Sequence, residues 1–190
     1  MVLFFDTETN GLPVGDVYPR MVQLGAILVD DDGNEVRVLN KIIKPTDWTI
    51  PDEAADIHGI STERALAEGE DLKSVLEEFL NIAEPATLLV CHNMQFDIPV
   101  ISQEFDRAGL DPDLENKDVY CTMVESTNVC KLPWYPGSPK YKWPKLIEAY
   151  RHFYGEDFED AHDALADVRA CKAVYAALQE RTEKKFLKRA

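Results

Sequence analysis

A short apolar run, residues 2–5, stops abruptly at polar and turn-forming residues that begin with Asp6. A run of this length with such an ending is typical of a buried β-strand, so the sequence places Asp6 at the end of the first strand. Residues 21–29 and 35–43 alternate apolar and polar side chains and flank a turn-forming segment at residues 30–34. Such a pair predicts a β-hairpin.

The rest of the chain alternates strand and helix patterns. Apolar runs predict strands, and apolar residues spaced by three and four predict amphipathic helices: strands at residues 87–91 and 119–122, and helices at residues 72–80, 98–108, 146–153 and 165–178. We place Asp97 at the start of the second helix and Pro99 in its first turn, where a missing N–H group costs little. Three strands followed by this alternation predict an α/β fold, a mixed five-stranded sheet flanked by helices.

One long loop is predicted at residues 131–144, which are rich in proline, lysine and aromatic residues. Two interpretations of this loop stand side by side. It either lines a groove or is a plain surface excursion.

The size and composition fit an ordinary globular protein. A chain of 190 residues predicts one compact domain, residues 1–190, that buries roughly 70% of the surface of the extended chain. The first residues contain neither a basic start nor an apolar stretch long enough for a signal peptide or a membrane span, so a cytoplasmic protein without membrane association is expected. The four cysteines form no CxxC pair, which favours reduced, mostly buried thiols over a zinc site or disulfides.

Acidic residues outnumber basic ones, and 35 Asp and Glu against 20 Lys and Arg give a formal net charge of −15. This charge opposes non-specific binding along a polyanion. A protein that holds nucleic acid through divalent cations nevertheless needs clustered carboxylates, and bound cations reverse the local sign of the field. The charge therefore argues against binding long tracts of nucleic acid more strongly than against gripping one chain end.

Five residues in three segments are candidates for chemistry. Asp6 and Glu8 are one residue apart, so an extended strand projects both carboxylates from one face. Asp97 lies where a strand gives way to a helix, and Asp167 follows His162 by five residues at the start of the last helix. Each element alone favours a simpler role: a solvated strand end for the first pair, a helix N-cap for Asp97 and surface positions for the last pair.

Together, the segments resemble the DEDDh family of 3′–5′ exonucleases, in the ribonuclease-H-like superfamily. The resemblance rests on FFDTETNGLP, VCHNMQFDIPV and AHDALADV, in this order, with Ile-His-Gly-Ile at residues 57–60 between the first two. It covers nearly the whole chain. It implies a ribonuclease-H-like fold and hydrolysis of phosphodiesters with two Mg²⁺ ions per site, for which Mn²⁺ substitutes.

The resemblance also implies a role for each of the five residues. Asp6 bridges the two ions, Glu8 and Asp167 complete the ligation of one ion, and Asp97 holds the other directly or through water. Carboxylates suit these roles because hard oxygen ligands match hard cations. His162 is the general base, since an imidazole with an unperturbed pKa of about 6.5 can accept a proton from the attacking water near neutral pH.

Six further residues match family positions that meet the terminal nucleotide. They are Thr7, Thr9, Leu12, His58, Asn93 and Phe96. Leu12 would wedge beside the last base, although packing under its own turn is the alternative. His58 could equally cap a turn, and Phe96 could belong to the core. Asn10 departs from the small residue that many relatives carry, and asparagine tolerates turn conformations.

The alternatives differ in substrate and in chemistry. The resemblance favours DNA with single-stranded or frayed 3′ ends, but an exoribonuclease fits the same residues because the catalytic groups act on the phosphate. A non-catalytic nucleic-acid-binding domain with the same fold is a further alternative. A phosphatase of the haloacid dehalogenase type is disfavoured because Glu8 replaces the second aspartate of its motif. A homodimer and a polymerase partner, as in proofreading or DNA repair, both stay open.

Overall fold

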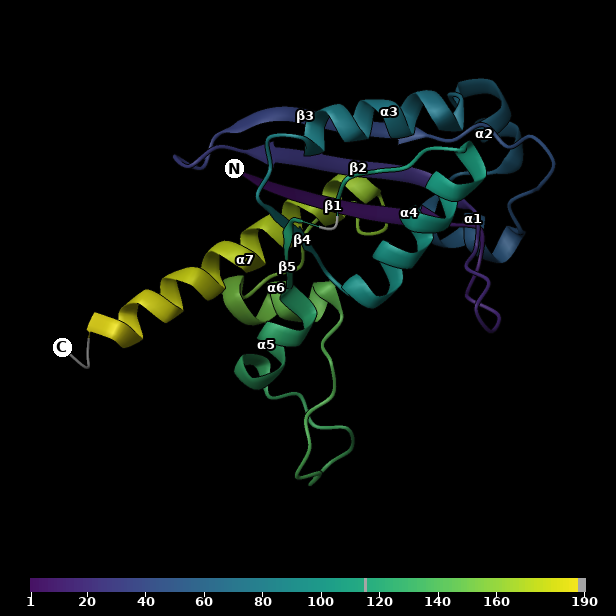
Figure 1. The fold of residues 1–190 in the computed structure, drawn as a ribbon. Helices are drawn as coiled ribbons and strands as arrows, with labels where there is room; N and C mark the ends of the chain where they lie inside the picture. Colours follow the sequence, from purple (N-terminus) through teal and green to yellow (C-terminus); the bar gives the residue numbers. More distant parts are fainter. Residues whose placement is uncertain (115, 188–190) are drawn as a thin grey trace.

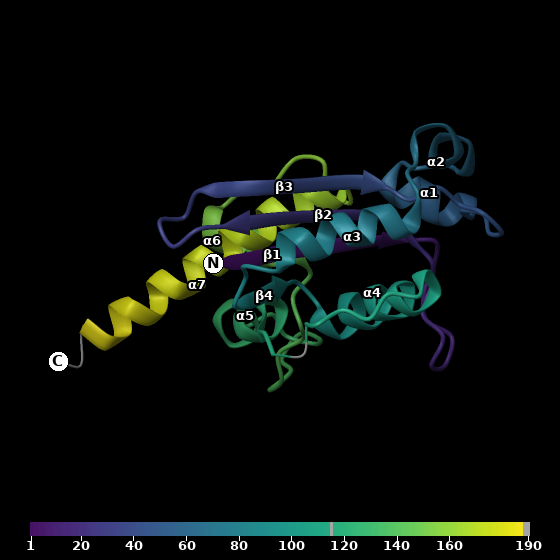
Figure 2. The ribbon, with the colours of Figure 1, turned by 45° about the horizontal axis from the view of Figure 1, so that its top comes forward.

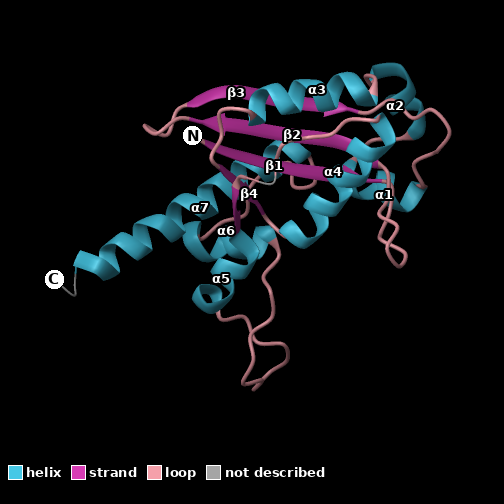
Figure 3. Ribbon diagram, in the orientation of Figure 1, coloured by secondary structure: helices cyan, strands magenta, loops and turns pink. Residues whose placement is uncertain are grey.

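The computed structural model of the protein describes residues 1–114 and 116–187. Its sheet has five strands in the order β3-β2-β1-β4-β5 (Figure 1). The strands are β1 (Val2–Thr9), β2 (Met21–Val29), β3 (Glu35–Ile42), β4 (Leu88–Cys91) and β5 (Asp118–Cys121). The first three are antiparallel, whereas β4 and β5 run parallel to β1. The predicted mixed sheet flanked by helices is confirmed, and its arrangement is that of the ribonuclease-H-like fold (Figure 3).

The two faces of the sheet are covered by different helices. Leu3 and Phe5 of β1 pack in a core with α3 (Leu72–Ala83) and α4 (Met94–Ala108). Phe4 points the other way and packs against α7 (Ala164–Leu187). Figure 2 shows α3 and α7 on opposite sides of the strands. The remaining helices are α1 (Asp52–His58), α2 (Thr62–Glu68), α5 (Thr122–Cys130) and α6 (Leu146–Tyr154).

Strand β1 is longer than its apolar run suggests. It continues past Asp6 to Thr9, so the prediction that the strand ends at Asp6 is wrong. The reason is its neighbour: β2 pairs with β1 along its whole length, with a register shift between Glu8 and Thr9. By contrast, β4 pairs only with Val2 to Phe4, which leaves the far half of that edge for the start of α4.

Helix α4 begins earlier than predicted. It starts at Met94, not at Ile98, so Asp97 is in its first turn and Pro99 lies inside the helix. The residue before the helix, Asn93, has a positive φ of 82°, which turns the chain sharply from β4 into α4. This turn was not visible in the apolar periodicity, which begins only at Ile98.

Two more predictions about local structure need correction. The alternation expected for β2 does not translate into a solvated face, because all nine residues are buried between helices on both sides of the sheet. Helix α5 was not predicted at all. Its sequence is rich in Thr, Val, Ser and Asn, which are weak helix formers, and it is held by tertiary packing through Thr122, Met123, Ser126 and Cys130.

Other features follow the sequence. The cysteines are unpaired, and Cys91, Cys130 and Cys171 are buried, as expected for reduced thiols. None of the helices within the described residues combines the length and the apolar character that crossing a membrane requires.

Candidate active site

Strand β1 supplies two carboxylates to the α7 side of the sheet. Because side chains alternate along a strand, Asp6 and Glu8 share the face of Phe4, which packs against α7. Thr7, between them, points to the opposite side, toward α4. The alternation of side chains along β1 therefore directs both acids toward the side of the sheet on which α7 packs.

The beginning of α7 brings His162 and Asp167 to these acids. His162 lies just before the helix with a positive φ of 73°, and its backbone N–H donates to Asp167 Oδ1 at 3.2 Å. One ligand atom each of Glu8, His162 and Asp167 can be chosen so that all three lie within 4.8 Å of one another. His162 is exposed to solvent. Residues from opposite ends of the chain thus form one cluster.

Asp97 approaches β1 from the side of α4. Its carboxylate is 3% exposed, and its Oδ1 accepts hydrogen bonds from Thr7 N at 3.2 Å and from Thr7 Oγ1 at 2.8 Å. The alternative role of Asp97 as N-cap is excluded because Asn93 occupies the cap position. Thr7 lies beyond the part of β1 that pairs with β4, so its free N–H group is available to fix Asp97 beside Asp6 and Glu8.

The acids of the cluster have no lysine or arginine beside them among the described residues. Burial raises the pKa of Glu8 to about 8, that of Asp97 to about 7 and that of Asp167 to about 6, and neighbouring carboxylates add to each shift. Burial and the charge of Asp97 also raise the pKa of Asp6 well above its usual range. None of the four acids forms an ion pair with a lysine or arginine in the part of the chain that the structure describes. Oxygen donors in this arrangement fit hard divalent cations such as Mg²⁺, which would supply the missing positive charge.

Three residues that the sequence interpretation missed hold the start of α7 in place. Gln23 of β2 is buried, accepts a hydrogen bond from Ala164 N at 3.2 Å and donates one to Asp163 Oδ2 at 2.9 Å. Asp163 Oδ1 accepts from the N–H groups of Leu165 and Ala166, which makes it the N-cap of the helix. An aspartate just before an apolar helical pattern is a recognisable cap signal, so Asp163 could have been found.

The third of these residues, Gly25 of β2, allows close approach of the helix. A Cβ atom at this position would lie 2.6 Å from the carbonyl carbon of Ala164. We therefore expect Gly25→Ala to push the first turn of α7 outward and to move His162 and Asp167 away from Glu8. A displacement of about 1 Å costs roughly 10²-fold in turnover. The measurement is kcat on an oligonucleotide at a temperature where circular dichroism shows the variant to be folded.

Gly69 offers a matched control for this substitution. A Cβ atom there would collide with the backbone of Ala65 on α2 and of Lys44 after β3, and neither of these segments carries one of the four acids. We expect Gly69→Ala to lose stability, as overpacking does, and to keep its turnover. Equal turnover in both folded variants would contradict the role assigned to Gly25.

An open cleft of about 510 Å³ adjoins the carboxylates and is lined partly by Glu8. Five of the six residues expected to meet the terminal nucleotide also line it: Thr7, Thr9, Leu12, His58 and Phe96. Leu12 is 81% exposed, so the alternative in which it packs under its own turn is excluded. Asn93, the sixth residue, is not part of this lining. It serves as N-cap position of α4, without a capping bond from its side chain.

His58 and Phe96 contribute differently to the cleft. The Nδ1 atom of His58 accepts a hydrogen bond from Ile60 N at 3.2 Å, whereas its buried Nε2 atom has no partner among the described residues. Burial lowers the pKa of this imidazole, which favours its neutral form. Phe96 is half-buried and meets Tyr18 edge to face, with ring centroids 6.4 Å apart. The cleft thus combines apolar surface with a neutral imidazole that lies close to the backbone of Thr9.

Residues 3–175 match the model of the Exonuclease family, RNase_T. The chain belongs to this family. The match agrees with the DEDDh resemblance and identifies the protein as a hydrolytic nuclease, an exonuclease. It excludes the phosphatase interpretation, for which Asp167 and His162 had no role.

Relatives of this exonuclease include phage and bacterial proteins. The uncharacterized exonuclease CP81 of Escherichia phage 186 is 32% identical over 186 residues, which cover 93% of this chain and 87% of the relative. The DNA polymerase III subunit epsilon of Treponema pallidum is 26% identical and is covered over 74% of its length. The epsilon subunit of Buchnera aphidicola (Schizaphis graminum) is 28% identical, with 68% of this chain and 55% of that relative covered.

The solved structures share the fold of this exonuclease. E. coli exonuclease I in complex with a dT13 oligonucleotide superposes with a TM-score of 0.79 at 23% identity, over 97% of this chain. The chain spans 42% of that larger protein. The likeness therefore concerns the common fold.

Proposed function

We propose that this exonuclease removes nucleotides one at a time from the 3′ end of nucleic acid, with DNA favoured over RNA. The observation that carries the proposal is the convergence of Asp6, Glu8, Asp97 and Asp167 beside an open cleft, without an ion pair to lysine or arginine among the described residues. The names of the relatives support the proposal. They include epsilon subunits of DNA polymerase III, and E. coli exonuclease I was solved with a dT13 oligonucleotide.

The four carboxylates would hold two divalent cations, Mg²⁺ in the first instance. When bound, such ions neutralise the phosphodiester, activate the attacking water and stabilise the leaving oxygen. The contribution of the protein is position: Thr7 fixes Asp97 through two hydrogen bonds, and the Gln23 and Asp163 contacts fix the helix that carries Asp167.

In this mechanism His162 acts as the general base. It accepts a proton from the water molecule whose oxygen attacks the terminal phosphorus. The bond from phosphorus to the 3′ oxygen of the preceding nucleotide breaks, this oxygen takes up a proton from solvent, and a nucleoside 5′-monophosphate is released. The exposure of the imidazole lets it pass the proton to solvent afterwards.

Specificity for a chain end would come from the cleft. Thr7 and Thr9 lie on its strand side, where their backbone groups could meet the terminal 3′ hydroxyl. Leu12 is 81% exposed and would pack beside the last base, while His58, whose imidazole also lies close to the backbone of Thr9, would contact the terminal nucleotide. Asn93, at the start of α4, is retained as a contact from the family resemblance alone.

A ladder assay tests the proposal. Single- and double-stranded DNA and RNA, each labelled at the 5′ end, are incubated with Mg²⁺, Mn²⁺ or chelator. We expect stepwise shortening of the labelled strand with either metal, none with chelator, and faster shortening of DNA. Release of label as a mononucleotide, or cuts inside the strand, would contradict 3′-end attack. Faster shortening of RNA would favour the exoribonuclease alternative.

The raised pKa values predict how stability depends on pH without metal. Because the folded-state pKa values of Glu8 and Asp97, about 8 and 7, exceed those of unfolded carboxyls, the folded protein binds more protons over this range. Proton binding by Glu8 and Asp97 therefore stabilises the folded protein fully at a pH below the pKa values of the unfolded chain. This stabilisation is lost as the pH rises through the folded-state pKa values. In chelator, we therefore expect the melting temperature to fall between about pH 5 and pH 8.

Divalent cations should reverse this dependence. At a cation concentration a hundredfold above its Kd, stability should rise by about 2.7 kcal/mol. That corresponds to roughly 5–10 °C for a domain of this size, with a smaller gain at pH 5 where protons compete. Thermal unfolding with and without Mg²⁺ at both pH values is the measurement. A melting temperature that rises with pH in chelator would contradict the electrostatic description of the cluster.

A further inference from the structure

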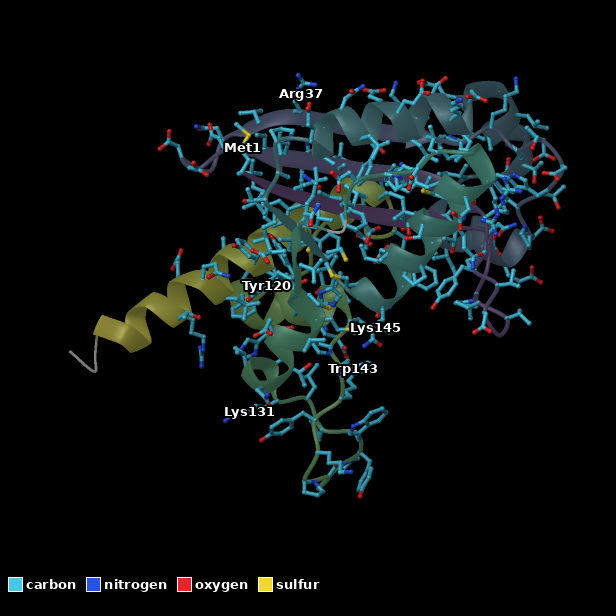
Figure 4. The ribbon with its side chains drawn as sticks, viewed as in Figure 1. Met1, Arg37, Tyr120, Lys131, Trp143 and Lys145 are labelled. Carbon is cyan, nitrogen blue, oxygen red and sulfur yellow. The ribbon has the colours of Figure 1, made fainter. Side chains whose placement is uncertain are left out.

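The segment from Lys131 to Lys145, here called the Lys131–Lys145 arm, differs sharply from the rest of the chain in charge. It contains four lysines and no acidic residue, in a protein with a net charge of −15. It also holds two of the three tryptophans of the chain. Figure 4 labels Lys131, Trp143 and Lys145 on this segment, which extends away from the sheet. The arm does not line the cleft beside the carboxylates, so that predicted alternative is wrong for this cleft.

The aromatic side chains of the arm face solvent. Trp134 is 65% exposed, Tyr135 63%, Trp143 54% and Tyr141 39%. Four large aromatic rings on one short segment form no core of their own. A group of large, exposed aromatic side chains on one segment indicates an interaction site.

The backbone of the arm is nevertheless ordered as a narrow hairpin. Pro133 and Tyr141 form an antiparallel bridge, and Lys142 N donates to Leu132 O at 2.8 Å. Near the tip, the Ser138 hydroxyl donates to Lys140 O at 2.9 Å. Four prolines further restrict the backbone of the arm. The rings are therefore presented on a shaped support, which lowers the entropy lost on binding.

The base of the arm is tied to the elements that carry the active site. His92, which directly follows β4, has its Nε2 atom 3.0 Å from Pro144 O and its Nδ1 atom 2.9 Å from Thr122 Oγ1. Thr122 Oγ1 in turn lies 3.4 Å from the sulfur of Cys171 on α7, the helix of Asp167. Burial lowers the pKa of His92 to about 4, so this bridge stays neutral near pH 7. The base of the arm thus lies at the carboxyl end of β4, where α4 with Asp97 also begins.

Three of the four lysines of the arm form no ion pair within the part of the chain that the structure describes. Lys142 pairs with Glu148 at 2.6 Å, and the charge of Lys145 also acts on Glu148 from a greater distance, whereas Lys131 and Lys140 have no acidic partner at ion-pair distance among the described residues. Aromatic rings interleaved with free ammonium groups match the chemistry of single-stranded nucleic acid, whose bases stack and whose phosphates carry charge. An acidic protein surface would satisfy the lysines but offers no bases for four exposed rings.

We propose that the Lys131–Lys145 arm binds the single-stranded part of the substrate that precedes the terminal nucleotide. This inference rests on the proposed function. The cleft would hold the 3′ end, while Trp134 and Trp143 stack on upstream bases and the free lysines contact upstream phosphates. The arm would attract the phosphates locally, although the net negative charge of the whole chain repels a polyanion.

The test compares long and short substrates in the full chain. In Trp134→Ala/Trp143→Ala, we expect the KM for a 5′-labelled single-stranded oligonucleotide of about 16 nucleotides to rise by roughly 30-fold or more, since stacking contributes on the order of 1–3 kcal/mol for each of the two bases. The kcat should stay within about twofold of the unchanged enzyme. Hydrolysis of the p-nitrophenyl ester of thymidine 5′-monophosphate, which is too small to reach the arm, should not change.

The control is Val36→Ala/Val38→Ala, which removes exposed apolar side chains from the edge strand β3. A KM for the oligonucleotide that rises no further than in this control would overturn the inference and leave a protein partner as the role of the arm. An equal loss on the small ester would also overturn it, because the effect would then lie in the active site. If the unchanged enzyme hydrolyses neither substrate, the proposed function itself has failed.

Salt dependence gives a second test through the lysines. Oligonucleotide affinity should fall with rising salt, and each lost phosphate contact should reduce the slope of log K against log salt by about 0.7. We expect Lys140→Ser/Lys145→Ser to reduce this slope and Lys73→Ser, an exposed lysine of α3, to leave it unchanged. An equal slope for all three proteins would overturn the phosphate contacts.

Discussion

Asp97→Asn is expected to lower exonuclease turnover by about 10³-fold and, at the same time, to stabilise the metal-free protein at pH 8. The loss follows from removing one cation-binding charge, whose contribution to the transition state is several kcal/mol at about 1.4 kcal/mol per factor of ten. The gain follows from removing a buried carboxylate that has no basic partner and whose pKa of about 7 leaves it charged at this pH. Ladder assays and thermal unfolding in chelator measure the two effects.

The fold of this variant should be preserved because asparagine is nearly isosteric with aspartate. The side-chain oxygen can still accept the hydrogen bonds from Thr7 N and Thr7 Oγ1. Turnover within tenfold of the unchanged enzyme, or a lower melting temperature in chelator, would contradict the assignment of Asp97 as a ligand.

Glu104 on the same helix provides a matched comparison. It is also almost fully buried, but its Oε1 accepts hydrogen bonds from Arg20 Nε, Arg107 Nη1 and Met21 N. Because its charge is compensated, we expect Glu104→Gln to destabilise the protein by about 3–5 kcal/mol, as breaking a buried ion pair does, and to leave kcat unchanged. Two buried acids on one helix should thus respond in opposite directions.

The candidate site was readable from sequence where local signals specify it. The spacing of Asp6 and Glu8 places both on one strand face whatever the strand pairs with, and the position of Asp167 follows from the start of the last helix. Local signals also gave the sheet and most helices, because apolar periodicity survives in each element. The prediction that these acids meet needed the family resemblance, since no local pattern reports contacts between distant segments.

The features that could not be predicted from the sequence depend on contacts between segments far apart in the chain. Strand β1 extends to Thr9 because β2 pairs with it, although its apolar run ends before Asp6. The need for glycine at position 25 comes from the backbone of Ala164, which approaches it from a distant helix. Helix α5 forms against the weak propensity of its residues because packing decides. Such features become visible only when the elements are assembled.

The net charge of −15 suggests poor affinity for nucleic acid, yet the charge is unevenly distributed along the chain. Part of the negative charge belongs to the acid cluster, which binds cations in the proposed mechanism. The Lys131–Lys145 arm, by contrast, is basic, and its base lies at the carboxyl end of β4. The overall charge would then favour release of the bulk of the strand, while the 3′ end and a few upstream nucleotides are held.

His162→Asn should lower turnover by about 10²–10⁴-fold, the usual contribution of a general base, while leaving cation binding intact. Asparagine is the substitution of choice because His162 has a positive φ of 73°, a conformation that asparagine tolerates better than alanine does. The exposed position leaves room for imidazole from solvent, so added imidazole should restore part of the activity. His152→Asn, which changes an exposed histidine on α6, serves as control and should keep full activity without rescue.

The nearness of His162 to Glu8 and Asp167 also permits a role as cation ligand, and an experiment can separate this role from that of a general base. A variant that imidazole does not rescue and that Mg²⁺ no longer stabilises against unfolding would assign His162 to the cation and not to the proton.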